Sequence, residues 1–456
     1  PPIGGGVLVV DQGVITDVGL AANVTIPEGA TVVDLTGKTV MPTLVDLHGH
    51  VGYQRGLGYD EANYTRENLT DELNRYAYYG VGTIVSMGTD PGDLAFQLQA
   101  EQQAGTLGGA RLHTAYRGFA RPNAGPGAAA LRASAYGVST EEEARAAVAW
   151  QAEQGFTRLK VYSNLTREAY DAVLQEAEAR GMIVTGHTPE GVRGPGVPFE
   201  APFDIAFDEV LNDGFETIEH VESLVWHGLS DREDAVAAQA LAGQIAEAGV
   251  PITPTLLAFH NLWRVADTQG AALTRPETDL LNPLVQATET DMYEYWSGAP
   301  AGPTAERDAF HLRMTRWLRA AGVTLVAGSD AGIFTNVPGL SLVEELELMV
   351  AAGLTPFDAL KAATDAPAQV LGRKGLDGCA LEGCAADLVL YACNPLADIS
   401  CLHSPEALIR GGGWLSKADL TALRDSARNH NLERTQENVL GGLAAQGVDI
   451  TALGLN

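Results

Sequence analysis

Two histidines separated by one residue end a short apolar run, VDLHGH. A β-strand places residues i and i+2 on the same face, so His48 and His50 are expected to point in the same direction. Two neutral imidazoles at the end of a strand can form half of a zinc site. The pair alone is weak evidence, because a single histidine is more often a hydrogen-bonded structural residue.

Four other residues of metal-ligand type also end β-rich runs: Lys160 in LKVY, His187 in VTGH, His220 in TIEH and Asp330 in VAGSD. Each of them alone is common in a folded protein. Their joint occurrence at strand ends, together with the His-x-His pair, is improbable by chance. The six residues are therefore predicted to form one metal site.

Lysine is an unusual ligand, because its ammonium group is a cation without an acceptor. When it is desolvated near a metal, its amine can react, and an amine that captures carbon dioxide becomes a carbamate. A carbamate is an anion with two oxygens and can bridge two metals. The alternative for Lys160 is a salt bridge to Asp330 in a site with one metal or none.

Short β-branched runs alternate with longer amphipathic stretches between residues 39 and 371. Eight strand candidates occur, at 39–50, 82–88, 111–116, 157–162, 181–187, 215–220, 249–255 and 322–330. Helical spacing or capping signals occur between them, at 139–143, 166–180, 231–248 and 340–352. Eight strands alternating with helices indicate a (β/α)8 TIM barrel, an α/β fold whose active face lies at the carboxyl ends of its strands.

The two flanks of the barrel differ from it and are similar to each other. Both are rich in glycine and valine with turn signals, which predicts short antiparallel strands that pair into one small β-sandwich. The predicted domains are residues 1–40 and 373–413 for the two parts of the β-sandwich, 41–372 for the barrel, and 414–456 for a helical tail. Because the chain starts at Pro1, we also expect that a leader or a first strand precedes it.

Composition limits the possible partners. The chain has 456 residues and a net charge of −29, with 46% hydrophobic residues, so it can build a large core but repels nucleic acid and anionic membranes. No apolar run approaches the roughly 20 residues of a membrane helix. The remaining partner class is a small-molecule substrate, and we also expect a homo-oligomer.

All four cysteines lie between Cys379 and Cys401. Thiols this close suggest local disulfides, with Cys379–Cys384 and Cys393–Cys401 the preferred pairing of three, and disulfides imply an oxidising compartment. We therefore expect an exported protein, periplasmic or extracellular. Reduced thiols in a cytoplasmic protein, or a zinc knuckle, are the alternatives.

The chain resembles the amidohydrolase superfamily over residues 1–413. The similar segments are VDLHGH, LKVY, GH, EH and GSDAG, at the ends of strands one, four, five, six and eight. Residues 337–372 and 386–399 more narrowly resemble the branch of Xaa-Pro dipeptidase-like and imidazolonepropionase-like enzymes. The resemblance implies the binuclear, carboxylated-lysine type, with two divalent ions, zinc by default. The cysteine-rich turn departs from the family pattern.

By this resemblance, His48, His50 and Asp330 would hold one metal, His187 and His220 the other, and the carbamate on Lys160 would bridge them. A metal-bridging hydroxide would attack a C–N bond with Asp330 as the proton shuttle. Tyr162 and His227 are predicted to assist. Arg55, Arg117, Arg121 and Arg193, on loops after strands, are candidates to bind a substrate carboxylate, and His260 is a candidate to line the pocket.

The expected substrate class is an amide, peptide or cyclic amide, as for a dipeptidase or an N-acyl amino acid amidohydrolase. The first alternative is a lactonase or phosphotriesterase-like hydrolase. The second is a one-metal deaminase, because Glu190 lies three residues past His187, where such enzymes use a glutamate. The third is a non-catalytic barrel, which is disfavoured because all six ligand-type residues are present.

Overall fold

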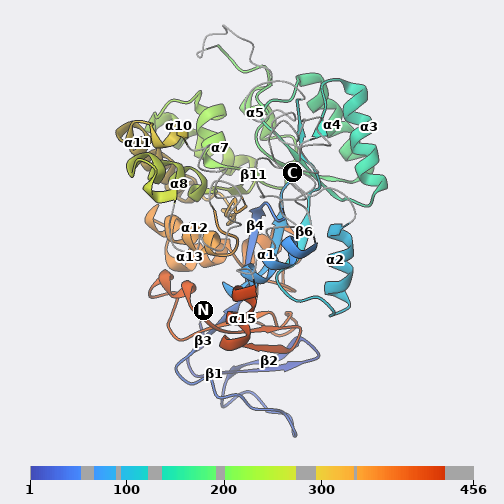
Figure 1. Cartoon of the computed structure of the whole chain (residues 1–456), viewed down its shortest axis with the longest axis vertical. Coiled ribbons are helices and arrows are strands. Elements are labelled where there is room, and N and C mark those ends of the chain that lie inside the picture. Colours follow the sequence, from blue (N-terminus) through green and yellow to red (C-terminus); the bar gives the residue numbers. More distant parts are fainter. Residues whose placement is uncertain are drawn as a thin grey trace, which may run out of the picture.

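The computed structural model describes residues 2–52, 66–88, 94–121, 136–191, 201–273, 294–332 and 336–426. Parallel strands with helices around them form the upper part of the molecule in Figure 1, and strands from both flanks of the chain form antiparallel sheets below it. The chain therefore has the parallel α/β character that the alternating sequence runs predict.

Seven of the eight predicted runs contain parallel strands. These are β4 (Leu44–Gly49), β5 (Val81–Ser86), β6 (Arg111–Thr114), β9 (Arg158–Val161), β10 (Ile183–Gly186), β11 (Ile218–Glu219) and β12 (Ile252–Thr253). Ladders join β4, β5 and β6 in one sheet and β9, β10, β11 and β12 in another. Two short strands, β7 (Phe119–Ala120) and β8 (Tyr136–Gly137), extend the second sheet beyond β9.

The eighth predicted strand, 322–330, is not a regular strand. Residues 323–331 instead make two isolated parallel bridges, Ile252↔Leu325 and Gly49↔Ala331. These bridges join β12 to β4, so the order of pairing runs from β6 through β4 and β12 to β9. Within the described residues no ladder joins β6 to β9, and closure of the ring stays a prediction.

The predicted capping signals are confirmed. Thr140 caps a helix with Glu143 in a capping box, and Thr166 caps the next helix, which ends at Gly181 in the left-handed conformation. The principal helices are α1 (Arg66–Tyr78), α2 (Leu94–Gln103), α3 (Glu141–Glu153), α4 (Arg167–Arg180), α7 (Ala235–Ala248), α8 (Leu256–Asp267), α11 (Ala301–Ala321), α12 (Leu340–Ala351), α13 (Pro356–Ala362) and α14 (Asp365–Val370). Shorter helical segments are α5 (Phe207–Val210), α6 (Val221–Ser223), Leu224–Gly228, Ala271–Leu273, α10 (Glu294–Ser297) and Ile399–His403.

The first predicted strand, 39–50, is in fact two strands in two sheets. Its first part, β3 (Thr39–Pro42), pairs antiparallel with β13 (Leu388–Tyr391). The regular pairing ends at Pro42, which has no N–H to donate, although the amide of Thr43 still donates to the carbonyl of Asp387 at 2.9 Å. The amide of Leu44 then donates to Gly80, and β4 begins in the parallel sheet.

Strands from the two flanks meet in the small antiparallel part. β13 also pairs with β14 (Pro405–Arg410), which pairs with β15 (Gly413–Ser416), and the helix α15 (Lys417–Ser426) follows. The hairpin of β1 (Gly6–Asp11) and β2 (Val14–Leu20) is attached through the amide of Ile15, which donates to the carbonyl of Cys384 at 2.9 Å. The preferred disulfide pairing is confirmed, whereas the exact domain boundaries stay a prediction.

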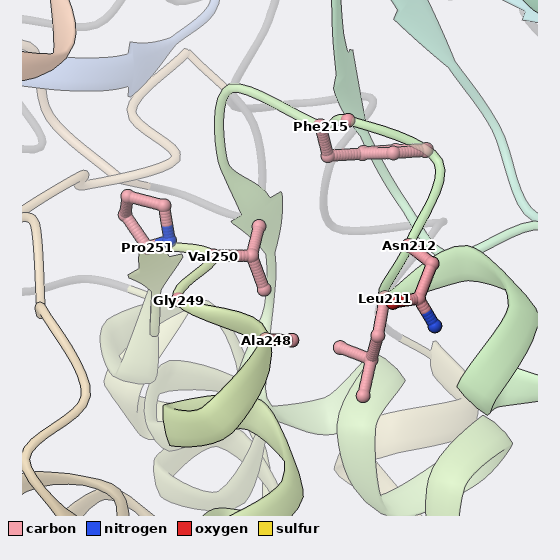
Figure 2. Close-up of a pocket in the computed structure, with 8 residues that line it drawn as sticks. Leu211, Asn212, Phe215, Ala248, Gly249, Val250 and Pro251 are labelled. Atoms are coloured by element: carbon pink, nitrogen blue, oxygen red, sulfur yellow. The ribbon is translucent and has the colours of Figure 1, made fainter.

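The largest apolar core lies between the parallel strands and the surrounding helices, and Tyr76, Leu73, Ile84 and Phe119 are fully buried in it. A pocket of about 270 Å³ lies at the amino ends of β11 and β12, between Leu211 and Phe215 on one side and Ala248, Val250 and Pro251 on the other (Figure 2). No helix among the described residues is long and apolar enough to cross a membrane.

Candidate metal centre

All six predicted ligand residues lie at or near the carboxyl ends of the parallel strands. Lys160 is in β9, and His48 is in β4, with His50 directly after that strand. His187 and His220 directly follow their strands, and Asp330 is in the segment 323–331 beside β4. Parallel strands present these ends on one face, and for that reason five distant segments of the chain contribute to one site.

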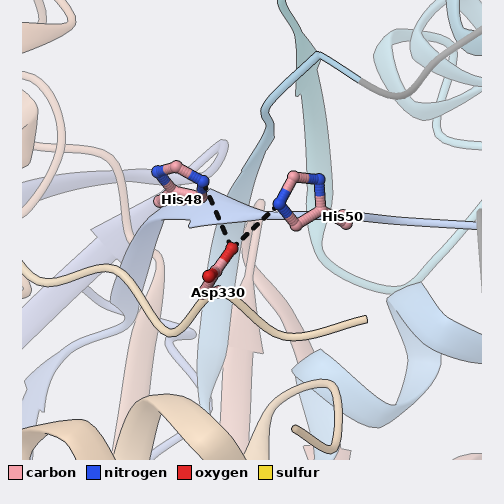
Figure 3. Close-up of side chains that lie close together, drawn as sticks. All are labelled: His48, His50 and Asp330. Atoms are coloured by element: carbon pink, nitrogen blue, oxygen red, sulfur yellow. Dashed lines mark hydrogen bonds and ion pairs between the residues drawn. The ribbon is translucent and has the colours of Figure 1, made fainter. Parts of the chain in front are cut away.

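His48, His50 and Asp330 form the centre of the site (Figure 3). The Nε2 atom of His50 lies 2.9 Å from Oδ1 of Asp330, and Nε2 of His48 lies 3.3 Å from the same oxygen. The alternation of β4 brings both imidazoles to Asp330, as the His-x-His spacing predicts. All three side chains are buried, and each offers an atom that can ligate a metal.

Lys160 joins this cluster from the neighbouring sheet. Its Nζ lies 3.2 Å from Nε2 of His48 and donates to the carbonyl of Met87 at 3.2 Å. The side chain is only 1% exposed, so its amine lies inside the site rather than at the surface. Its position beside His48 fits either a carbamate that acts as a ligand or a charged lysine.

His220 and His187 complete the cluster from β11 and β10. The ring of His220 lies 4.8 Å from that of His48 and 4.4 Å from that of His187. The Nδ1 of His220 contacts the hydroxyl of Thr255 at 2.6 Å, and this hydroxyl donates to the carbonyl of Pro254. The hydroxyl therefore accepts from Nδ1, which leaves Nε2 of His220 as the nitrogen with a free lone pair.

The backbone at the strand ends is unusual. His220 and Asp330 have φ values of 70° and 52°, in the left-handed region that residues with a side chain rarely adopt. Gly186 has a φ of 131°, and a Cβ there would lie 2.3 Å from the carbonyl oxygen of Val161. Strain of this kind persists where the surrounding structure enforces it, and it gathers at functional sites.

Electrostatics inside the cluster favour an ionised Asp330 and neutral imidazoles at His50 and His220. Burial would raise the pKa of Asp330, but its close contacts with the imidazoles of His48 and His50 outweigh burial and hold that pKa well below its usual range. Burial lowers the pKa of His50 to about 3 and that of His220 well below its ordinary value. Metal ligands must be in these protonation states, so the site is prepared for a cation.

The donor set fits a divalent metal. Nε2 of His220 and Nδ1 of His50 are buried without a hydrogen-bond partner in the described part of the chain. An unpaired buried nitrogen is costly unless another group, such as an ion, satisfies it. His48 and His50 turn Nε2 toward one carboxylate oxygen, and imidazole with carboxylate is the ligand mixture that suits zinc and similar ions.

Tyr162 directly follows β9 and lies beside this cluster, as its position two residues beyond Lys160 predicts. Its ring centre is 5.2 Å from that of His187 and 4.9 Å from Nζ of Lys160. The side chain is buried, with Gly118 so close that a Cβ at Gly118 would meet the tyrosine ring at 2.4 Å. Tyr162 can therefore line the site, and its catalytic role stays a prediction.

His227 is not brought into the cluster. It lies in the π-helical turn Leu224–Gly228, where its Nε2 donates to the carbonyl of Ile205 at 2.8 Å and its ring packs on Phe203 and Phe207. These contacts hold it in an apolar layer behind β11. The prediction that His227 assists catalysis is not retained.

The remaining candidates have other contacts or fall outside the described residues. His260 contacts the carboxylate of Asp308 at 3.1 Å, as expected for a structural histidine. Glu190 accepts a hydrogen bond from the indole of Trp226. The guanidinium of Arg117 lies over the ring of Tyr116, and the amide of Arg121 donates to the side chain of Asn164. Arg55 and Arg193 lie outside the described residues.

The sequence interpretation missed the buried residues that support the ligands. Glu219 contacts His48, and Asp46 accepts hydrogen bonds from the amides of His48 and Ser329. Burial raises the pKa of Asp46 to about 7, although hydrogen bonds from Ser329 oppose this rise. The available signal was an acidic residue in a run expected to be buried, such as the aspartate in VDLHGH.

Part of the chain is similar to proteins of known family. Residues 301–431 match the model of the Amidohydrolase family. Ochratoxinase from Aspergillus niger is 34% identical over 124 residues, which are 26% of this chain and 25% of that protein. The chain therefore spans about a quarter of the curated relatives that it matches.

Solved structures are similar over nearly the whole chain. A Xaa-Pro dipeptidase with bound methionine in the active site has a TM-score of 0.63 at 22% identity, covering 90% of this chain and 95% of that one. The bottromycin amidohydrolase has a TM-score of 0.66 at 23% identity (92% and 86%), and A. niger ochratoxinase 0.59 at 19% (90% and 91%). These likenesses support a TIM-barrel-type α/β fold.

Proposed function

We propose, from the premise that this chain is an amidohydrolase-superfamily protein of the prolidase-like branch, that it hydrolyses the C–N bond of a small amide or peptide with two bound metal ions. The family match and the fold support the superfamily. The observation that carries the proposal is the meeting of His48, His50, Lys160, His220 and Asp330 in one buried cluster.

The proposed ligand set follows the two halves of the cluster. His48, His50 and Asp330 would hold one ion, and His187 and His220 the other, with a carbamate on Lys160 between them. Bound metals of this kind lower the pKa of water to near 7 and polarise a carbonyl. Zinc is the first choice for these ligands, although iron, manganese or cobalt accept the same atoms.

Asp330 is the proposed proton carrier. Its carboxylate is ionised in the cluster, so it can accept a proton from the attacking water and pass it to the leaving amine. Its Oδ1 already lies within hydrogen-bonding distance of His50, which fixes the direction of the second oxygen. Tyr162, whose ring lies 5.2 Å from that of His187, would close one side of the site and orient a bound carbonyl group.

The substrate class is an N-acyl amino acid or a dipeptide, and the scissile group is an amide. The test is a hydrolysis panel on the metal-loaded chain that contains dipeptides, N-acyl amino acids, lactones, phosphotriesters and aminopurines, with metal content measured in parallel. Amide hydrolysis with about two ions per chain supports the proposal. Release of ammonia from an aminopurine, or faster turnover of a lactone, would assign the site to an alternative class.

Replacing Lys160 by alanine tests the carbamate. The Lys160→Ala variant is expected to lose activity, because no bridging anion can form, and to regain part of it when short carboxylates are added. Kinetics with and without formate or acetate measure this rescue. Near-normal turnover without an added carboxylate would contradict the bridging role.

An exported location and a homo-oligomeric state complete the proposal. The two disulfides, Cys379–Cys384 and Cys393–Cys401, support an oxidising compartment, since cytosolic thiols are kept reduced. Free-thiol titration of the protein taken from its native compartment tests this, and four titratable thiols would contradict it. Light scattering at working concentration measures the number of copies that associate.

A further inference from the structure

Glu219, a residue outside the proposed ligand set, has an unusual place beneath the metal centre. It is fully buried at the end of β11, and its Oε2 lies 2.6 Å from Nδ1 of His48. A carboxylate has no proton to donate, so Nδ1 of His48 must be the donor in this contact. The proton of the neutral imidazole is thereby held on Nδ1.

The other oxygen of Glu219 is held by hydroxyl groups. Oε1 accepts from Thr217 and lies 3.3 Å from the hydroxyl of Thr185, which itself contacts the carbonyl of Thr217 at 3.0 Å. Thr185 lies in β10 and Thr217 directly before β11, and both are fully buried. The carboxylate therefore has a fixed orientation before any ligand arrives, and it holds the ring of His48 from behind.

The opposite nitrogen of His48 faces the centre of the site. Its Nε2 lies 3.2 Å from Nζ of Lys160 and 3.3 Å from Oδ1 of Asp330. With the proton on Nδ1, the lone pair of Nε2 points to this centre. A carboxylate behind a ligating imidazole also makes the imidazole a more basic ligand.

We infer that Glu219 is a positioning residue that selects the Nδ1–H tautomer of His48, fixes its ring and raises its strength as a metal ligand. The inference rests on the proposed function, because it assigns a role toward the metal. The contact of Glu219 with His48 differs from the contact that supports His220. The Nδ1 of His220 donates to the neutral hydroxyl of Thr255, so the imidazole of His220 gains less basicity. Of these two proposed ligands, His48 is therefore expected to bind a metal more strongly.

The experiment compares metal affinity in matched variants of the full-length chain. Glu219→Gln keeps the size of the side chain but removes its charge, and Co²⁺ affinity of the metal-free protein is measured by competition with a chromophoric chelator. The expected loss is about 10- to 100-fold. The control is Glu216→Gln, the same change three residues earlier, where the carboxylate pairs with Arg158 and has no histidine partner among the described residues.

A second readout does not depend on the metal. The proton on Nδ1 of His48, shared with a carboxylate at 2.6 Å, should give a strongly downfield imidazole resonance in the metal-free chain. Glu219→Gln should remove this resonance and Glu216→Gln should keep it. If Glu219→Gln does not fold, Thr217→Val replaces it, because loss of one hydroxyl donor should weaken Co²⁺ binding and shift the resonance.

The outcomes separate the two proposals. Unchanged Co²⁺ affinity in a folded Glu219→Gln variant, or an equal loss in Glu216→Gln, would overturn the positioning role and leave the proposed function standing. Failure of the unaltered chain to bind Co²⁺ would overturn the proposed function, whereas the resonance would still report whether Glu219 holds the His48 tautomer. Loss of affinity and of the resonance in Glu219→Gln alone is the supporting result.

Discussion

At the amino ends of the parallel strands the positive-φ backbone falls on glycines, whereas at the carboxyl ends it falls on three residues with side chains in or beside the candidate site, in addition to glycines such as Gly186. The glycines end α4, α7 and α11 just before a strand segment begins and are Gly181, Gly249 and Gly322, with φ values of 65°, 74° and 91°. The residues at the other end are His220, Thr255 and Asp330, with φ values of 70°, 46° and 52°.

Glycine adopts this conformation at little cost, but a residue with a Cβ loses roughly 1–2 kcal/mol. The amino ends therefore follow the rule for stable helix termini. The carboxyl ends carry strain in order to turn a particular side chain into the site. The difference teaches that one end of the strands is built for stability and the other for chemistry, as in barrel enzymes generally.

The largest expected effect is a loss of turnover caused by a substitution at the carboxyl ends of the strands. Asp330→Asn keeps the shape of the side chain but removes its charge, so it removes a ligand and the proton carrier together. We expect kcat to fall by roughly 10³- to 10⁴-fold with little change in thermal stability. Steady-state kinetics and thermal unfolding measure the two quantities. Retention of most of the turnover would show that the carboxylate of Asp330 is neither an essential ligand nor the proton carrier.

A stability effect is expected at the amino end. Arg158 and Glu216 form a buried ion pair at the starts of β9 and β11, with both side chains less than 10% exposed. Glu216→Gln leaves the guanidinium without its counter-charge, which should lower the free energy of unfolding by roughly 3 kcal/mol. Chemical denaturation measures this, and kcat of the metal-loaded variant should not change. A large loss of turnover would show that residues at the amino ends of the strands also contribute to catalysis.

Where the backbone is regular, the sequence correctly predicts which candidate residues lie close together. Period two on β4 correctly places His48 and His50 together, and the ends of β-rich runs correctly locate Lys160 and His220. The cap residues are equally local signals, and Thr140 is found where its spacing to a glutamate predicts it. These features depend on residues that are close together in the sequence, so the sequence alone predicts them.

Other features depend on contacts between distant segments. Glu219 and His220 are adjacent, and a regular strand would point them to opposite faces, but the φ of 70° at His220 turns its ring toward the site while Glu219 contacts His48. No local sequence pattern predicts the positive φ of His220. The π-helical turn that removes His227 from the site is similar, because its partner Ile205 is distant along the chain.

The pH dependence of stability should also distinguish the two ends. At the carboxyl end, Glu345 accepts hydrogen bonds from the amides of Leu256 and Leu257, and burial raises its pKa to about 8 although these bonds oppose the rise. The ordinary value is 4.5, so between the two values the folded chain binds a proton that the unfolded chain has lost. Its contribution to stability is complete below the unfolded value and is lost as pH rises toward 8.

Glu345→Gln removes this dependence. The free energy of unfolding of the metal-free variant, measured by denaturant titration between pH 5 and 9, should fall less with rising pH than that of the unaltered chain. Above about pH 8, the pKa of the folded carboxyl, the free energy of unfolding of the two proteins should change with pH at the same rate. Parallel curves across the whole range would mean that Glu345 is ionised in the folded protein and that its burial is offset by its backbone donors.

The smallest expected effect is the change in stability caused by positive φ alone. A substitution that adds a Cβ at the amino ends of the strands should destabilise the chain, whereas one that removes a Cβ at the carboxyl ends should not. A Cβ at Gly249 meets no atom within 4 Å, so Gly249→Ala changes only the backbone preference and should destabilise the chain by about 1 kcal/mol without altering Co²⁺ affinity. Thr255→Gly relieves a similar strain, so its thermal stability should be equal or higher. It also removes the hydroxyl that holds Nδ1 of His220, so its Co²⁺ affinity should fall. A Thr255→Gly variant that is less stable but binds Co²⁺ normally would show that Thr255 serves the fold and not the site.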